Sequence, residues 1–294
     1  MRRSSLVLGF SILVLCSIAF GLWYAAWRED RRGLLTVSFL NIGQGDAIFI
    51  DAPSGRQMLI DGGRGSVVLR ELGRVMPWWD RSIDVVLATH PDLDHIGGLP
   101  DVLARYDVST IIRSSVRDEG ADQVAFLRAI DSEKDAKAVI ALRGQIIDLG
   151  STGSPQAGRP HVYLEILFPD RPIPSVETNT GSVVARLVYG NTSFMLTGDA
   201  PLGVEEYLVS LDGSSLKSDV LKAGHHGSRT SSDVSFVGYV SPSYAVFSRG
   251  CDNSYGHPHK EVVELFARFG IPTLDTCTDG VITFISDGNS VFRK

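Results

Sequence analysis

Basic residues are scarce over most of this 294-residue chain. The formal net charge is −6, and because residues 1–33 carry +3, the rest of the chain carries −9. Proteins that coat nucleic acid non-specifically bind phosphates through a basic surface, so the acidic body argues against that class. A metal enzyme that acts on phosphates is not excluded, because bound cations reverse the sign of the local charge.

Cysteine is scarce as well, and the sequence has no internal repeat of fixed period. Cys251 and Cys277 could form a bridge if the domain is exported. Unpaired small apolar side chains are the commoner case, so we expect both to be free. No change of composition marks a second domain, and residues 34–294 are therefore predicted to form one domain, long enough to bury a sizeable core.

A long uncharged run stands at the N-terminus, over residues 6–27. As a helix it would reach about 33 Å, enough to cross a bilayer, and aromatic residues at its far end suit the membrane interface. A cleaved signal peptide is the alternative, although its apolar core is usually shorter. We predict an uncleaved membrane anchor over residues 1–27, a charged linker over residues 28–33 and a main domain on the extracytoplasmic side.

Alternating and continuous apolar runs predict two series of strands. The first lies at residues 34–43, 46–53, 56–63 and 83–90, the second at 163–169, 182–190, 192–199, 218–224 and 244–250, and two more strands at 280–286 and 290–294 close the chain. Helical patterns occur at Ser66–Met76, Leu99–Tyr106, Gln123–Asp131, Glu205–Leu211 and Lys260–Phe269, and loop composition at Ser151–Pro160 and Pro169–Ser182. This rhythm suits helices that cover the outer faces of two stacked sheets.

Histidine and aspartate cluster where the predicted strands end. One strand is followed by ATHPDLDHIGG, which carries His90, Asp92, Asp94 and His95. Other strand ends carry Asp61 in LIDGG, Asp199 in FMLTGD, the pair His225 and His226 in VLKAGHHGS, and His257 and His259 in NSYGHPHKE. Turns explain the aspartates and glycines but not the imidazoles beside them. Loops at strand ends bring distant side chains together, so these residues are candidate metal ligands.

The order of these motifs resembles the metallo-β-lactamase superfamily. The phrases FLNIGQGDAIFI, MLIDGG, ATHPDLDHIGGL, NTGSVVARL, FMLTGDA, VLKAGHHGSRTSS and NSYGHPH are similar, in order, to the extramembrane hydrolase domain of ComEC-type competence proteins, the DNA-uptake channels. The resemblance implies a mixed α/β fold, a four-layer αβ/βα sandwich with a dinuclear metal site between the loop edges of its sheets. The chain lacks the many-span channel body of those proteins, so the resemblance concerns hydrolysis rather than DNA uptake.

The resemblance implies six metal ligands. His90 and Asp92 would hold one cation, Asp94 and His95 the other. Asp199 would bridge the two. His225 would complete the second site, in preference to His226, because superfamily members often show a ligand histidine followed by one residue and then glycine.

The superfamily's third motif usually supplies another histidine, and NTGSVV stands in its place. Asn179 or Ser182 is therefore expected to contact water or substrate instead. Replacing two imidazoles by the carboxylate of Asp92 and a neutral oxygen makes the site harder, so Mn²⁺ becomes plausible beside Zn²⁺. Two cations about 3.5–4 Å apart would suit phosphoester displacement by a shared hydroxide.

Candidate catalytic residues are Asp94, Asp61 and His257. Asp61 is expected to orient a metal ligand rather than to bind metal. His257 could donate a proton to the leaving oxygen or steady the charge of the phosphate, and the alternative is a polar turn before the helix at Lys260. The candidate substrate contacts are Asn179, Ser182, His226, Ser228, Tyr255 and Lys222. Lys222 could equally be a solvated charge.

The sequence favours a membrane-anchored, metal-dependent hydrolase of phosphodiesters, a DNA nuclease related to competence with single-stranded DNA as its substrate. A phosphodiesterase or lactone hydrolase of small or cell-wall substrates is the alternative within enzymes, because a fold does not fix a substrate. A non-catalytic anchored binding module is the alternative outside enzymes. Retention of both Asp-His pairs argues against that module.

Overall fold

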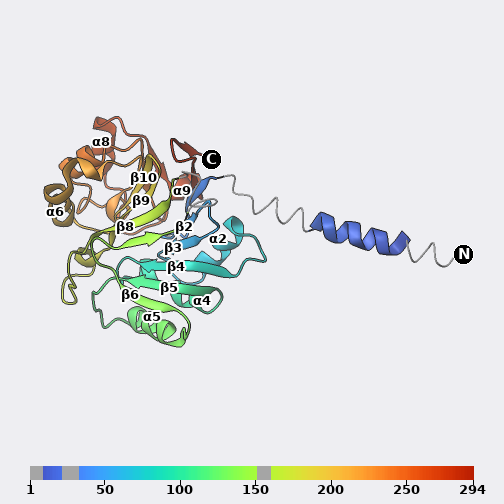
Figure 1. The fold of residues 1–294 in the computed structure, drawn as a ribbon. Coiled ribbons are helices and arrows are strands. Elements are labelled where there is room, and N and C mark those ends of the chain that lie inside the picture. The colour runs from blue at the N-terminus through green and yellow to red at the C-terminus, as the bar shows by residue number, and fades with distance from the viewer. Residues whose placement is uncertain (1–8, 22–32, 151–159) are drawn as a thin grey trace, which may run out of the picture.

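Two β-sheets lie face to face at the centre of the structure, a computed structural model that describes residues 9–21, 33–150 and 160–294 (Figure 1). The first sheet has the strand order β15-β14-β1-β2-β3-β4-β5-β6. Its strands are β1 (Leu35–Phe39), β2 (Ile48–Asp51), β3 (Gln57–Ile60), β4 (Ser82–Ala88), β5 (Asp107–Arg113), β6 (Lys137–Ile140), β14 (Ile282–Ser286) and β15 (Val291–Arg293). Strands β3 to β6 are parallel, and the other neighbours pair antiparallel.

The second sheet has the strand order β13-β12-β11-β10-β9-β8-β7. Its strands are β7 (Ile146–Asp148), β8 (Val162–Phe168), β9 (Val184–Tyr189), β10 (Thr192–Leu196), β11 (Val220–Lys222), β12 (Tyr244–Phe247) and β13 (Thr273–Asp275). Strands β10 to β13 are parallel, whereas β7 to β10 form an antiparallel meander. Both sheets therefore contain a parallel half whose carboxyl ends share one edge.

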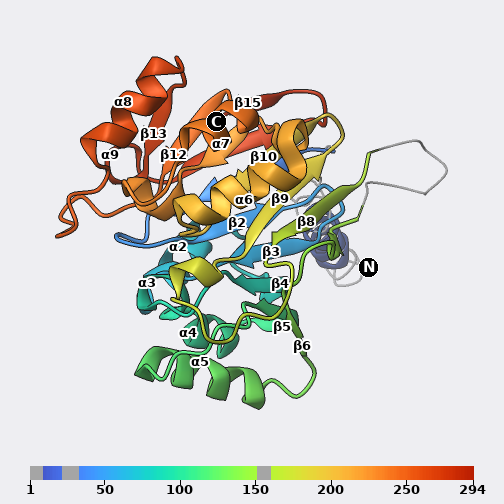
Figure 2. The same ribbon diagram turned by 90° about the vertical axis from the view of Figure 1, so that its left-hand side faces the viewer.

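Helices cover the outer face of each sheet (Figure 2). Those on the first sheet are α2 (Val67–Val75), α3 (Leu93–Ile96), α4 (Leu99–Leu103) and α5 (Ala121–Ser132). Those on the second sheet are α6 (Leu202–Asp212), α7 (Val234–Val240) and α8 (Lys260–Arg268). Short helices complete the chain: α9 (Thr276–Asp279), η2 (Asn179–Gly181), η3 (Gly213–Leu216) and η4 (Gly224–Gly227). The αβ/βα layer order predicted above is confirmed.

Three aromatic rings join the inner faces of the two sheets. Phe284 of β14 packs edge-on against Phe39 of its own sheet and against Phe194 of the opposite sheet, with 6.2 Å between ring centroids in both pairs. All three side chains are fully buried. Because burying one such side chain contributes about 1.5–3 kcal/mol, this contact stabilises the stacking on which the loop edge depends.

Several elements were not predicted from the sequence. Strand β5 lies inside the first sheet between β4 and β6, although residues 107–113 gave no clear alternation. Helix α7 begins after Asp233, whose carboxylate accepts hydrogen bonds from the backbone N–H groups of Ser235 and Phe236. Its sequence, VSFVGYV, is rich in β-branched residues and disfavours a helix, so the cap and the burial of one face outweigh its propensity.

Residues 9–21 form a helix whose side chains are exposed. The predicted anchor over residues 1–27 extends beyond this helix on both sides, into residues outside the described ones. Within the described ranges, no helix has the length and apolar character needed to cross a membrane. Apart from Gly33, the predicted linker over residues 28–33 also lies outside the described residues, as does most of the loop Ser151–Pro160. The anchor and the linker stay predictions.

Cys251 and Cys277 form a disulfide, so the expectation that both are free is wrong. Cys251 lies in the loop after β12, and Cys277 lies in α9 directly after β13. These two strands are parallel neighbours, and their carboxyl ends bring the two Cα atoms to 5.0 Å. The pairing depends on strand adjacency, which the spacing of cysteines along the chain does not reveal.

Replacing Cys251 and Cys277 together by serine is expected to lower the free energy of unfolding by about 3 kcal/mol, because the bridge constrains the unfolded chain. Urea unfolding of the full chain, followed by circular dichroism, measures this change. Cys16→Ser removes the free, exposed cysteine and serves as a control without an expected effect. Equal midpoints for the wild type and the double variant would contradict the prediction.

Candidate metal centre

Loops from both sheets meet at one edge of the sandwich. Strands β3 and β4 are parallel neighbours in the first sheet, and β10 and β11 are parallel neighbours in the second. The residues at their carboxyl ends are Asp61 after β3, His90, Asp92, Asp94 and His95 after β4, Asp199 after β10, and His225 and His226 after β11. Asp46, in the loop between β1 and β2, joins them. Residues that are far apart in sequence therefore surround one point.

Glycine allows the β1–β2 loop to approach the loop after β4. Gly45 has φ +117°, and a Cβ atom there would lie 1.9 Å from the carbonyl oxygen of Asp94. The backbone N–H of Asp46 donates a hydrogen bond to that same oxygen at 3.1 Å. A larger residue at position 45 would push the two loops apart, because neither backbone can yield by that distance.

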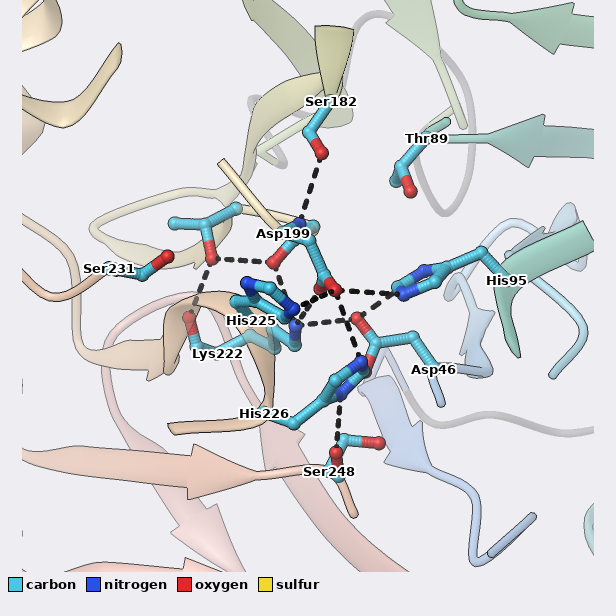
Figure 3. A network of polar contacts seen from close by, with 12 residues as sticks. Asp46, Thr89, His95, Ser182, Asp199, Lys222, His225, His226, Ser231 and Ser248 are labelled. Atoms are coloured by element: carbon cyan, nitrogen blue, oxygen red, sulfur yellow. Dashed lines mark hydrogen bonds and ion pairs between the residues drawn. The ribbon is translucent and has the colours of Figure 1, made fainter. Parts of the chain in front are cut away.

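The carboxylate of Asp199 lies at the centre of the cluster (Figure 3). Its Oδ2 atom is 3.2 Å from Nε2 of His226 and 3.3 Å from Nε2 of His95. Nε2 of His225 approaches the same oxygen at 3.5 Å from the solvent side. The Nε2 atoms of three histidines therefore converge on one carboxylate oxygen.

Hydrogen bonds at Nδ1 orient the two buried imidazoles. Nδ1 of His95 lies 2.8 Å from Oδ2 of Asp61, and Nδ1 of His226 lies 2.7 Å from the carbonyl oxygen of Ser248. Asp61 is itself fixed by the backbone N–H and the hydroxyl of Thr89. With Nδ1 as the donor in these bonds, Nε2 of each ring is the atom left to bind a cation, which is the arrangement of metal-binding histidines.

Three imidazole nitrogens at this site are buried without a hydrogen-bond partner: Nε2 of His90, His95 and His226. Buried polar atoms are normally paired, so such orphans require an explanation. Ligand atoms of Asp46, His95, Asp199 and His226, all buried, lie within 4.8 Å of one another. A divalent cation would satisfy the nitrogens and neutralise the carboxylates, and the donor set fits one.

Two aspartates lie at the rim of this group. Oδ2 of Asp94 is 3.7 Å from Nε2 of His226, on the side that faces Asp199. Oδ2 of Asp92 is 3.7 Å from Nε2 of His90. Asp94 thus adds a carboxylate to the group around Asp199. His90 and Asp92 form a second nitrogen and oxygen pair, next to His95.

Burial and neighbouring charges shift the pKa values in the cluster. Burial lowers the pKa of His226, but Asp199 and Asp46 outweigh it and raise that pKa to about 9. Burial raises the pKa of Asp199, yet His226, His95 and Lys222 hold it well below its ordinary value. For His90, burial and the charge of His95 lower the pKa well below 6.5, so this ring is neutral. A cation bound among these groups would displace ring protons.

The backbone is strained at three residues of the cluster. Asp61, His225 and His226 have φ angles of 59°, 48° and 56°, in the left-handed region that favours glycine. They are three of the five non-glycine residues with positive φ in the described ranges. Such conformations cost about 1–3 kcal/mol each and persist only where the surroundings hold them, which is typical of functional sites.

The left-handed turn also decides which histidine lies inside. His226 is 1% exposed at its side chain, whereas His225 is 25% exposed and its Nδ1 lies 3.1 Å from the hydroxyl of Thr230. The sequence predicts His225 as the ligand and His226 as a substrate contact. In the structure His226 belongs to the buried group, and His225 lies at its entrance.

Three predicted substrate contacts prove to be interior residues. Ser182 is fully buried, and its hydroxyl accepts a hydrogen bond from the backbone N–H of Asp199 at 3.2 Å. Lys222 is also fully buried and is neither a solvated charge nor open to substrate. Ser228 is 4% exposed, and its hydroxyl lies 2.9 Å from that of Thr230. These three expectations are corrected, because packing of the surrounding segments buries all three side chains.

The two other predicted contacts, Tyr255 and Asn179, are exposed and half-buried, respectively. Tyr255 is 54% exposed and stacks on His257, with 5.6 Å between ring centroids and 22° between planes. Asn179 keeps a buried Oδ1 without a partner. Burial and the charges of His226 and His225 lower the pKa of His257 to about 4, so its ring is neutral at pH 7.

Asp46 was not among the predicted site residues. Its Oδ2 pairs with Nζ of Lys222 at 2.6 Å, and its Oδ1 lies 3.5 Å from Nδ1 of His226. The phrase NIGQGD carried the signal, since two glycines and a carboxylate follow a predicted strand as in the other motifs.

Fold and site together define a metal-dependent hydrolase class, with a buried Asp/His cluster at the loop edge of an αβ/βα sandwich. The chain belongs to the metallo-beta-lactamase superfamily, whose family model matches residues 40–250.

The comparisons also confirm the resemblance to competence-type proteins. The chain is 30% identical over 270 residues to "ComE operon protein 3" of Bacillus subtilis (strain 168), a match that covers 84% of this chain and 32% of that protein. It is 42% identical over 110 residues to "Competence protein ComA" of Neisseria gonorrhoeae, covering 37% of this chain and 16% of that protein. The chain thus spans less than a third of the length of these relatives by either match.

A solved structure shares the fold. The metallo-beta-lactamase fold protein YhfI from Bacillus subtilis aligns with a TM-score of 0.51 at 14% identity, covering 82% of this chain and 95% of that chain. At that identity the likeness concerns the fold alone.

His226→Ala is expected to weaken the binding of Mn²⁺ or Zn²⁺ by the full chain at least about tenfold, because it removes a buried candidate ligand from the group around Asp199. His225→Ala is the matched control from the same turn, and its effect should be smaller than threefold. Isothermal titration calorimetry with each metal measures both. The reverse ranking would restore the assignment of His225 made from the sequence.

Proposed function

We propose that this chain is a phosphodiesterase that cleaves single-stranded DNA with the help of two divalent cations. The observation that carries the proposal is the set of buried, unpartnered imidazole nitrogens around Asp199. The match to a protein described as a competence protein supports nucleic acid as the substrate class. Neither a lactone hydrolase nor a binding module would account for the similarity to a competence protein. A binding module would also have no need of the buried Asp/His cluster.

The candidate ligands form two neighbouring sets, because the ring of His90 lies 4.0 Å from that of His95. We propose that one cation is held by Asp94, His95 and His226, and the other by His90 and Asp92, with Asp199 shared between them. Cations held there would act as Lewis acids and supply a hydroxide nucleophile at neutral pH. Three carboxylates in the combined set support Mn²⁺ as well as Zn²⁺.

The residues at the entrance divide the remaining tasks. The neutral ring of His257 lies 5.5 Å from that of His225, next to the cluster, which supports a role toward the leaving group. Asn253 holds it in place, since its side chain accepts from the backbone N–H of His257 and donates to its carbonyl oxygen, both at 2.9 Å. His257 is proposed to steady the leaving group by hydrogen bonding, and Tyr255 to contact the substrate.

The disulfide supports an extracytoplasmic location for this domain. Disulfides persist in oxidising compartments and are rare in the cytoplasm, and the bridge Cys251–Cys277 lies at the partly exposed loop beside the site. The uncharged run over residues 6–27 supports attachment to the membrane. We propose that the chain is anchored by its N-terminus with the catalytic domain outside.

Asp199→Ala is expected to lower the rate of cleavage of a fluorescent single-stranded oligonucleotide at least about a thousandfold, because the carboxylate lies at the centre of the proposed metal site. The assay uses the full chain with Mn²⁺ or Zn²⁺, and the small ester bis(p-nitrophenyl) phosphate in parallel. Asp101→Ala, an exposed position in α4, is the control. Cleavage of the small ester alone would favour a small-molecule phosphodiesterase. Bound metal without cleavage of either substrate would favour the binding module.

Tyr255→Ala is expected to raise the KM for single-stranded DNA about tenfold, because stacking of one base on an aromatic ring contributes about 1–3 kcal/mol. Tyr255→Phe keeps the ring and should leave the KM unchanged. An abasic oligonucleotide, which has the same phosphates without bases, should not distinguish the variants. Trp78→Ala, a highly exposed aromatic residue in the turn before β4, is the control. An equal loss on the abasic substrate would rule out stacking.

A further inference from the structure

Lys222 is a charged side chain buried beneath the metal centre. It ends β11, is 0% exposed, and is the one buried lysine in the described part of the chain. Its ammonium group has three oxygen partners: Oδ2 of Asp46 at 2.6 Å, the carbonyl oxygen of Gly198 at 2.8 Å and Oδ1 of Asp199 at 3.3 Å. An ammonium group has three N–H donors, so all of them are engaged.

The two oxygens of Asp199 therefore have different surroundings. Oδ1 accepts from Lys222, whereas Oδ2 faces the three Nε2 atoms of His95, His225 and His226 (Figure 3). The backbone N–H of Asp199 is held as well, by the hydroxyl of Ser182. The carboxylate cannot rotate without breaking the contact to Lys222, so one oxygen is presented to the ligand group and the other is withheld.

Asp46 balances the charge of this arrangement. A buried ammonium without a counter-ion is strongly disfavoured, and Asp46 provides the shortest contact that Lys222 makes. Asp46 is itself fixed through its backbone, because its N–H donates to the carbonyl oxygen of Asp94 and its carbonyl oxygen accepts from Gly63. The pair Lys222 and Asp46 thus connects Asp199 with the loops of the first sheet.

We propose that Lys222, with Asp46 as its counter-ion, is a positioning residue that restricts Asp199 to binding cations through Oδ2 alone. With Oδ1 engaged by Lys222, Oδ2 is the oxygen of Asp199 that would remain available to cations. The inference rests on the metal site proposed above. It assigns Lys222 to the interior of the site rather than to the substrate.

The test compares metal binding by full-length variants. Lys222→Met combined with Asp46→Asn removes the ion pair, leaves the net charge of the cluster unchanged and keeps a side-chain oxygen at position 46. Altered binding therefore reports the orientation of Asp199 rather than a change of charge or the loss of an oxygen donor. We expect this double variant to fold, to bind Mn²⁺ at least about tenfold more weakly, and to show a changed electron paramagnetic resonance spectrum of bound Mn²⁺. Lys217→Met, at an exposed lysine five residues earlier, is the control.

Unchanged affinity and an unchanged spectrum in the folded double variant would overturn the proposal and leave the pair a structural ion pair. If the double variant does not fold, the ammonium signal of ¹⁵N-lysine in the wild type replaces it. Among the described residues all other lysines are exposed, so a signal protected from exchange belongs to Lys222. It should persist when Mg²⁺ or Zn²⁺ saturates the site, and its loss would overturn the proposal. A wild-type chain that binds no metal would overturn the metal site itself.

Discussion

The buried carboxylate of Asp199 is the group on which the rest of the site depends. Removing a carboxylate from water is strongly unfavourable unless cations and hydrogen-bond donors surround it. Here the surrounding groups are the imidazoles of His95 and His226 on one oxygen and the ammonium of Lys222 on the other. Each belongs to a different strand end from Asp199, so burial of this one charge holds the loops of both sheets together.

The scaffold makes that concentration of charge possible. Parallel strands in each sheet align their carboxyl ends, and the aromatic contact between Phe194 and Phe284 stacks the sheets so that the two sets of loops face each other. The glycine at position 45 allows the loops to touch at backbone distance. Electrostatic attraction holds these side chains on loops that hydrophobic packing positions, because charge pairing alone would not offset their desolvation.

Much of the fold was predictable, because a strongly periodic hydrophobic pattern fits only one type of secondary structure. Helices α2, α5 and α8 occur where apolar spacing indicated them, and the αβ/βα order followed from the motif series. Strand β5 and helix α7 were not predicted, since their local sequences favour no element clearly and packing against neighbouring elements determines their secondary structure. The disulfide was not predicted either, because only the pairing of β12 with β13 brings its two cysteines together.

The sequence by itself determined the chemical character of the site: which residue types carry it, their order, and their place after strands, since motif spacing and hydrophobic pattern are local properties. The tertiary structure decided which atoms converge. The left-handed turn at His225 and His226 directs the second ring inward, and the β1–β2 loop adds Asp46. Lys222 became an interior cation because β11 ends beneath the loops. Side-chain direction and burial depend on packing between distant segments, which no single stretch of sequence contains.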